Sequence, residues 1–150
     1  MVPRPEADAG APDDSETDTG LGRVLVVDDD PAGRLFTASV LVDAGYRVET
    51  SGSMADAAER LDDAANTGFG VVVLDPRVSD FLLDDGVEDL RAVSDAPIVI
   101  YTAAEIAAEP DLGRGTAAVV PRGRGSGRDL LVAVAAAVAV VAADGTVALD

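Results

Sequence analysis

Acidic or hydroxyl side chains end three short apolar runs of the sequence. The runs and the polar residues that follow them are VLVV with Asp28, Asp29 and Asp30, VVVL with Asp75, and IVIY with Thr102. Unbroken apolar runs of this length, separated by helical stretches, are typical of buried parallel strands. In an open parallel sheet, the residues just past the strand ends line one crevice, which is where ligands bind. We therefore expect Asp28, Asp29 and Asp75 to converge beside Thr102.

Clustered carboxylates have the chemistry of a site for a hard divalent cation such as Mg²⁺, and bound Mg²⁺ recruits phosphate. Asp75 can act as a nucleophile toward phosphorus, because carboxylates form acyl phosphates. Phosphoryl transfer also needs a metal that neutralises the equatorial oxygens and a donor that holds the product. We expect Asp28, Asp29, Asp75 and a backbone carbonyl, that of Arg77, to share the metal. Repulsion among the carboxylates predicts that, without a cation, the pKa of at least one of them is raised.

The composition excludes several other kinds of site. The 150-residue chain contains neither cysteine nor histidine, so it has no thiol nucleophile, no imidazole base and no His- or Cys-ligated zinc. The longest apolar stretch, residues 130–143, is too short and too rich in alanine to span a bilayer, and the N-terminus shows no signal peptide. A chain of this length forms one domain with a real core. We expect a cytoplasmic protein that does not cross a membrane.

The charge restricts the partners. The formal net charge is -17, and all 11 basic residues are arginine. Such an acidic surface repels DNA, RNA and anionic lipid, so direct binding of nucleic acid is not expected. Abundant acid without lysine indicates a halophile that works in molar salt, where charges are screened beyond about 3 Å.

The segments between the apolar runs predict five repeats of strand and helix. The predicted strands are residues 24–27, 46–50, 70–74, 97–102 and 116–120, and the predicted helices are residues 31–45, 54–65, 86–93, 105–109 and 128–143. This order predicts an α/β fold with a doubly wound, five-stranded parallel sheet, flavodoxin-like, with strand order 2-1-3-4-5. Residues 1–21 are expected to be a disordered acidic tail, residues 22–143 the folded domain, and residues 144–150 a short C-terminal tail.

Some helices carry more specific expectations. The apolar face expected on the first helix consists of Leu35, Phe36, Val40 and Leu41. Ser53 is expected to cap the second helix, and Ser126 with Asp129 resembles a capping box at the start of the last. The last helix is apolar around its whole circumference, so its outer face is expected to bind a partner or a second copy of the chain.

The strings VLVVDDDP, VVVLD and PIVIYTA resemble segments of the receiver domains of two-component response regulators, over residues 22–143. The resemblance implies that Asp28 and Asp29 bind Mg²⁺ and that Asp75 accepts a phosphoryl group from a histidine kinase. It also implies that Thr102 hydrogen-bonds the phosphoryl group and moves on activation. The string GVEDLR at 86–91 resembles the start of the helix that follows the phosphoacceptor loop.

The sequence departs from the family at several positions. Pro121 stands where receivers have a lysine, and Arg122, one residue later, is a candidate replacement, although a planar guanidinium is not equivalent to an ammonium group. Ala118 stands where the family often has an aromatic residue. Pro76 directly follows the phosphoacceptor and removes a backbone N–H beside the site. The acidic pocket is therefore kept, while the parts that read phosphorylation out are altered.

Arginines after the last strand leave a further alternative open. Arg122, Arg124 and Arg128 lie in a glycine-rich loop at the same sheet edge as Asp75. They could hold an anion near the helix N-terminus, or they could be solvated charges that balance the acidic rim.

Three functions fit these residues. The first is a stand-alone receiver, phosphorylated on Asp75 by a histidine kinase, that signals through an output protein or through dimerisation by the last helix. The second is a degenerate receiver that binds a protein partner independently of phosphate. The third is a phosphatase of the haloacid-dehalogenase type, in which Asp28 would be the nucleophile, although the late acidic motif and the usual cap of that family are missing. We expect a signalling receiver rather than a turnover enzyme.

Overall fold

The structure is a computed structural model that describes residues 22–63, 68–78 and 86–149. The predicted N-terminal tail, residues 1–21, lies outside the described residues, and so do residues 79–85 between the predicted strand at 70–74 and the predicted helix at 86–93. The strands are β2 (Arg23–Val27), β3 (Arg47–Ser51), β4 (Val71–Leu74), β5 (Ile98–Ala103) and β6 (Ala118–Arg122). The helices are α1 (Pro31–Asp43), α2 (Met54–Asp63), α3 (Gly86–Arg91), α4 (Ala104–Ala107) and α5 (Ser126–Leu149).

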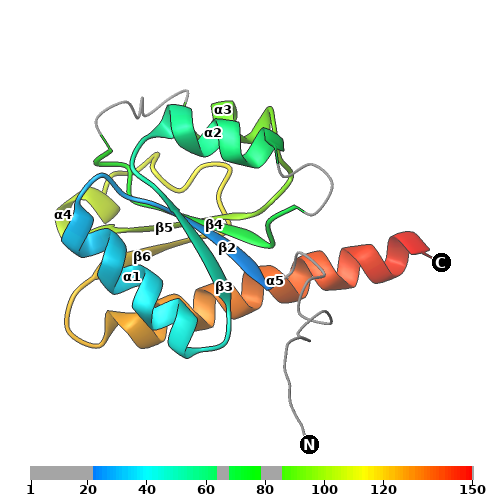
Figure 1. The fold of residues 1–150 in the computed structure, drawn as a ribbon. Coiled ribbons are helices and arrows are strands. Elements are labelled where there is room, and N and C mark those ends of the chain that lie inside the picture. Colours follow the sequence, from blue (N-terminus) through cyan, green and yellow to red (C-terminus); the bar gives the residue numbers. More distant parts are fainter. Residues whose placement is uncertain (1–21, 64–67, 79–85, 150) are drawn as a thin grey trace, which may run out of the picture.

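The strands form one parallel sheet in the order β3-β2-β4-β5-β6. Counted in the order in which the chain makes them, this is 2-1-3-4-5, so the predicted fold class is confirmed. Helices α2 and α3 cover one face of the sheet, and α1 and α5 cover the other (Figure 1). The carboxyl ends of all five strands therefore lie along one edge of the sheet.

Two apolar cores explain why the strands read as unbroken apolar runs. Alternate residues of a strand point to opposite faces, so Leu25 and Val27 pack with α2 and α3, whereas Val24 and Val26 pack with α1 and α5. All four side chains are buried. A strand covered on both faces has no position at which a polar side chain would reach water.

The last strand lies two residues further along the chain than predicted. β6 includes Pro121 and Arg122, and its register pairs Thr102 with Pro121 and Ala103 with Arg122. The predicted strand ended at Val120, directly before Pro121, and proline normally interrupts a ladder of hydrogen bonds. Here β6 is an edge strand, where proline is tolerated because no neighbouring strand needs its missing N–H. The shift places Arg122 at the carboxyl end of the sheet.

The apolar face predicted for α1 is only partly correct. Thr37 and Leu41, four residues apart, are its buried side chains, whereas Leu35 is 69% exposed and Phe36 is 52% exposed. The start of the helix is fixed by Asp30, whose side chain accepts a hydrogen bond from the backbone N–H of Gly33 over 3.0 Å. From that start, the helical period turns Thr37 and Leu41 toward the sheet. Leu35 and Phe36 therefore lie on the outer side of the helix.

The last helix is longer than predicted. α5 runs from Ser126 to Leu149, so the expected C-terminal tail at 144–150 is helical up to Leu149, and α5 continues beyond the sheet (Figure 1). Ser126 is already helical, and its hydroxyl lies 2.7 Å from the hydroxyl of Tyr101. Among the described helices, none is long and apolar enough to cross a membrane. The cap predicted for α2 is confirmed, because Ser53 Oγ accepts from the N–H of Asp56 over 3.0 Å.

Candidate functional site

Three polar side chains that are almost completely buried meet at the carboxyl edge of the sheet. Asp28 follows β2 and Asp75 follows β4, and each is 2% exposed; Thr102, near the end of β5, has no exposed surface. Hydrogen bonds continue the ladder past the strand ends, from Asp75 N to the carbonyl of Val27 and from Asp28 N to that of Ser51. The pairing of β2 with β4 therefore sets the two carboxylates side by side.

The carboxylate of Asp75 accepts hydrogen bonds at both oxygens. Its Oδ1 accepts from the hydroxyl of Thr102 over 2.7 Å and from the backbone N–H of Arg77 over 3.0 Å. Its Oδ2 accepts from Arg77 Nη2 over 3.1 Å. This contact, and then the charge of Asp75, raise the pKa of the Arg77 guanidinium. The carboxylate of Asp75 is therefore held by a hydroxyl and by the residue two positions along the chain.

The side chain of Arg77 is a site residue that the sequence analysis missed. The sequence suggested only its backbone carbonyl, as a metal ligand, yet its guanidinium forms an ion pair with Asp75. The signal that could have found it is the turn Asp75-Pro76-Arg77, in which the aspartate accepts from the N–H two residues on and so faces the arginine side chain. This guanidinium is about half exposed and can leave the carboxylate for solvent.

The second carboxylate, that of Asp28, is held from both sides of the crevice. Its Oδ1 accepts from the backbone N–H of Asp30 over 2.9 Å, and its Oδ2 accepts from Arg122 Nη2 over 3.0 Å. Burial raises the pKa of Asp28, and the charge of Asp75 adds to the increase, against the hydrogen bond from Asp30 and the charge of Arg122. The pKa of one carboxylate is raised as expected, but burial, rather than repulsion between the carboxylates, is the main cause.

Arg122 extends from β6 toward the two buried carboxylates. Besides its ion pair with Asp28, its Nε lies 3.8 Å from Asp75 Oδ2, and its Nη1 donates to the hydroxyl of Thr37 over 3.3 Å. Its guanidinium carbon lies 4.2 Å from the centre of the Tyr101 ring. Only 20% of the side chain is exposed. The structure therefore brings Arg122 to both carboxylates, at the edge where the receiver resemblance calls for a lysine.

The metal ligands expected from the sequence are only partly gathered. Asp29 is exposed, because the residue after Asp28 points away from the crevice. The part of the chain that the structure describes contains no group of three or more acidic side chains placed to hold a metal ion. Asp28 and Asp75 fit Mg²⁺ by their chemistry, because both are hard oxygen donors and they follow adjacent strands. They are close enough together for one cationic group, that of Arg122, to contact both.

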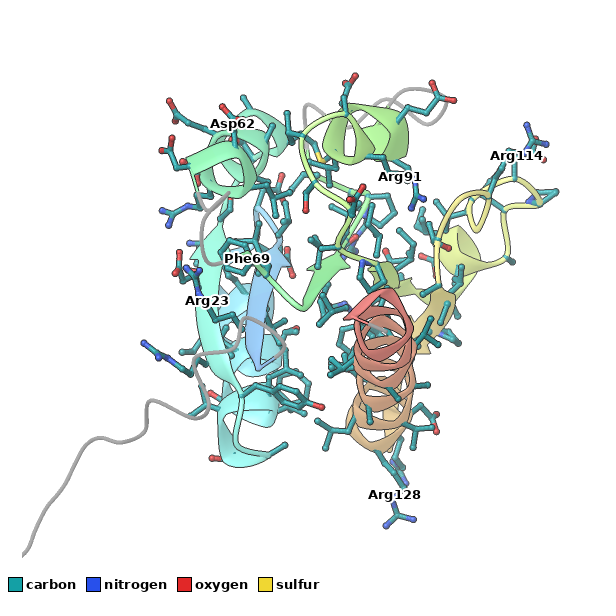
Figure 2. All side chains as sticks on the ribbon, turned by 90° about the vertical axis from the view of Figure 1, so that its right-hand side faces the viewer. Arg23, Asp62, Phe69, Arg91, Arg114 and Arg128 are labelled. Carbon is teal, nitrogen blue, oxygen red and sulfur yellow. The ribbon has the colours of Figure 1, made fainter. Side chains whose placement is uncertain are left out.

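The other loop arginines do not join this cluster. Arg124 and Arg128 are exposed, and Figure 2 shows Arg128 pointing away from the molecule at the start of α5. These positions fit solvated charges at the acidic rim, one of the two alternatives that the sequence left open. Arg122 is the member of the three that faces the carboxylates.

Of the comparisons with known proteins, the one with solved structures supports the fold. No protein-family model matches the chain, and no curated protein matches it by sequence. A response regulator receiver domain protein from Clostridium thermocellum is similar, with a TM-score of 0.66 and 19% identity over 77% of this chain and 93% of that one. Chemotaxis response regulator CheY4 of Vibrio cholerae has a TM-score of 0.60 and 26% identity, over 75% of this chain and 97% of that one. The receiver domain of the hybrid histidine kinase CckA has a TM-score of 0.62 and 20% identity, over 77% and 98%.

Proposed function

We propose that this chain, whose fold is that of CheY-like receiver domains, accepts a phosphoryl group on Asp75 from a histidine kinase and signals through an output protein. The observation that carries the proposal is the contact between Asp75 and Thr102. The carboxylate is buried at the end of the central strand β4, and the hydroxyl of Thr102 donates to it over 2.7 Å. A hydroxyl at this place can hold a phosphoryl oxygen once the carboxylate is modified.

The proposed transfer is a displacement at phosphorus with Oδ2 of Asp75 as the nucleophile. Oδ1 is held by the hydroxyl of Thr102 and the backbone N–H of Arg77, whereas Oδ2 is held by a side chain that can move. Oδ2 forms the new P–O bond, the P–N bond to the donor histidine breaks, and the histidine nitrogen keeps the electron pair. Once Arg77 has turned aside, its guanidinium is placed to bind a phosphoryl oxygen.

Asp28, Asp29, Asp75 and the backbone carbonyl of Arg77 are the proposed ligands of Mg²⁺. When bound, Mg²⁺ supplies positive charge opposite the equatorial oxygens of the transferred group. Asp28 and Asp75 are already within the crevice, and the exposed Asp29 would complete the set from the rim. Arg122 is the proposed replacement for the lysine that Pro121 displaces.

The remaining parts of the proposal concern partners and setting. A histidine kinase as donor implies a cytoplasmic location, and the output passes to another protein or to a second copy that pairs through α5. On that helix Val132 is 65% exposed and Val140 is 59% exposed. The net charge of -17 without lysine supports a cell interior with concentrated salt.

A degenerate receiver that binds its partner without phosphorylation is the second proposal. The observation that favours it is that both carboxylates already have guanidinium partners, Asp75 in Arg77 and Asp28 in Arg122. In this case the crevice would be a neutralised structural site, and the surface around it would be the functional part.

Intact mass decides between the two proposals. The full chain is incubated with Mg²⁺ and acetyl phosphate in molar KCl, with Asp75→Asn as the control. A gain of one phosphoryl group in the wild type that the control lacks supports the first proposal. No gain in a folded wild type overturns it and supports the second. Release of phosphate in repeated turnovers that Asp28→Asn abolishes would indicate the phosphatase instead.

A further inference from the structure

The guanidinium of Arg122 lies between the two buried carboxylates of the crevice. Its Nη2 donates to Asp28 Oδ2 over 3.0 Å, and its Nε lies 3.8 Å from Asp75 Oδ2. That Nε is buried, and it is the one buried side-chain nitrogen or oxygen without a hydrogen-bond partner among the described residues. The guanidinium therefore lies close enough to both carboxylates to interact with their charges. It forms a hydrogen bond with Asp28 but not with Asp75.

Several contacts hold Arg122 in this place, so its position is not that of a surface side chain. Its Nη1 donates to Thr37 of α1, and its guanidinium lies over the ring of Tyr101, which is 1% exposed. A cation over an aromatic ring gains more when both groups are removed from water. The pairing of Ala103 with Arg122 fixes the backbone from which the side chain starts.

A divalent cation bound by Asp28 and Asp75 would need the space that Arg122 fills. Mg²⁺ binds carboxylate oxygens at about 2.1 Å and accepts little distortion of its octahedral geometry. Asp28 Oδ2 is at present the acceptor of Arg122 Nη2. Two cationic groups at one carboxylate oxygen repel each other, and within a crevice this repulsion is stronger than in water. The two cations are therefore alternatives at Asp28.

We propose that Arg122 is the resident counter-cation of this crevice and competes with Mg²⁺ for Asp28, so that metal binding moves Arg122 off the Tyr101 ring. The inference rests on the proposed function only for the role of Mg²⁺ in phosphoryl transfer. Because the competing group belongs to the chain itself, its strength is fixed by the fold, and Mg²⁺ binds the wild type weakly. Removal of the guanidinium frees the carboxylates for the metal.

Calorimetric titration with Mg²⁺ tests the competition, in a constant background of molar KCl and without a phosphodonor. Arg122→Gln is expected to bind Mg²⁺ at least about tenfold more tightly than the wild type. Arg124→Gln is the matched control, because it removes the same charge from an exposed position two residues away, and its affinity should stay within about twofold of the wild type. Equal affinities in the wild type and Arg122→Gln, an equal gain in both variants, or no binding in either variant overturns the inference.

A second measurement uses the wild-type crevice and does not depend on the folding of Arg122→Gln. The chain contains two tyrosines and no tryptophan, so in Tyr46→Phe the near-ultraviolet circular dichroism reports mainly on Tyr101. Titration with Mg²⁺ is expected to change this signal with the midpoint found by calorimetry, because Arg122 leaves the ring. Binding of Mg²⁺ without a change at Tyr101 overturns the inference.

The outcome is independent of phosphorylation. If Asp75 takes no phosphoryl group but Arg122→Gln gains affinity for Mg²⁺, the proposed function fails and the competition stands. If Asp75 is phosphorylated but the affinities of the wild type and Arg122→Gln are equal, the function stands and the competition fails.

Discussion

At the scale of single residues, the side chain of Arg77 is paired with Asp75 Oδ2, the oxygen proposed as the nucleophile. It is about half exposed, yet its Nη2 donates to Asp75 Oδ2 over 3.1 Å. A half-exposed ion pair is screened by solvent and contributes about 1 kcal/mol or less. The contact is therefore strong enough to slow a reaction at Oδ2 and weak enough to open.

Arg77→Ala should raise the rate of phosphorylation by acetyl phosphate by roughly fivefold, because it frees Oδ2 at a cost of about 1 kcal/mol. The measurement is the time course of the phosphorylated mass. Arg114→Ala is the control, since Arg114 pairs with Asp111 on an exposed loop away from the crevice. A slower rate in Arg77→Ala would mean that the guanidinium mainly binds the incoming phosphoryl group.

Gly33 allows the first turn of α1 to approach Asp28. A Cβ at this position would lie 2.8 Å from Asp28 Oδ2 and 3.1 Å from Asp30 Oδ2. Gly33→Ala should therefore lower the free energy of unfolding by about 1–3 kcal/mol, although alanine is the better helix former.

Urea unfolding measures this difference, with Gly127→Ala as the matched glycine in the first turn of α5. Its Cβ would meet Val40 at 3.7 Å, an ordinary contact, so this variant should gain up to about 1 kcal/mol from helix propensity. A stable Gly33→Ala would show that Asp28 shifts without cost.

The raised pKa of Asp28 has a predictable effect of pH on stability. Burial is the main cause of the raised pKa, so the folded state keeps the proton of Asp28 to a higher pH than the unfolded state does. The contribution of Asp28 to the free energy of unfolding is fully present below the ordinary pKa of an aspartate. It is lost as the pH rises through the raised pKa of the folded state. Asp28→Asn should remove this loss and unfold at a higher urea concentration than the wild type at pH 7. Equal midpoints at pH 7 would show that the ion pair with Arg122 offsets the cost of burial.

At the scale of elements, the predictions were accurate for strands that are buried on both faces, because an unbroken apolar run of that length is typical of such a strand. Strands β2, β4 and β5 were found from their apolar runs, and the strand order followed from the connections between them. The same argument placed Asp28, Asp75 and Thr102 at one edge. Asp29 does not join them, because neighbouring residues at a strand end point in different directions.

Elements at the edge of the sheet were predicted less well. Proline ends most strands, so Pro121 hid the extension of β6 that carries Arg122 to the carboxylates. The apolar residues Leu35 and Phe36 resembled a core face, but the helical period that starts at Asp30 points them outward. The contact between Arg77 and Asp75 leaves only one trace in the sequence, the turn Asp75-Pro76-Arg77.

Helix α5 has an exposed apolar face that supports the proposed pairing of two chains. Val132→Glu should abolish dimers, because a charge at a helix interface is not buried without a partner. The measurement is the mass by light scattering at several protein concentrations in molar KCl. Val42→Glu, an equivalent exposed valine on α1, is the control. A wild type that is monomeric at every concentration would contradict the pairing.

At the scale of the whole molecule, the net charge of -17 opposes compaction at low ionic strength. Raising KCl from 0.1 to 3 M shortens the screening length from about 10 Å to below 3 Å. The melting temperature should therefore rise by roughly 10 °C or more. Thermal unfolding followed by circular dichroism measures this. An unchanged melting temperature would contradict the proposed salt-rich setting.

Pro121 affects how molecules of this chain associate at high concentration. Among the described residues, no strand pairs with the outer side of β6, and such an edge offers its backbone to an extended segment of another molecule. Concentrated salt screens the repulsion between acidic chains and can strengthen apolar association, so charge alone does not prevent aggregation. A proline within β6 has no N–H to donate to an incoming strand. Pro121, at the position where the resemblance to receivers implies a lysine, should therefore also hinder the addition of a strand from another molecule to this edge.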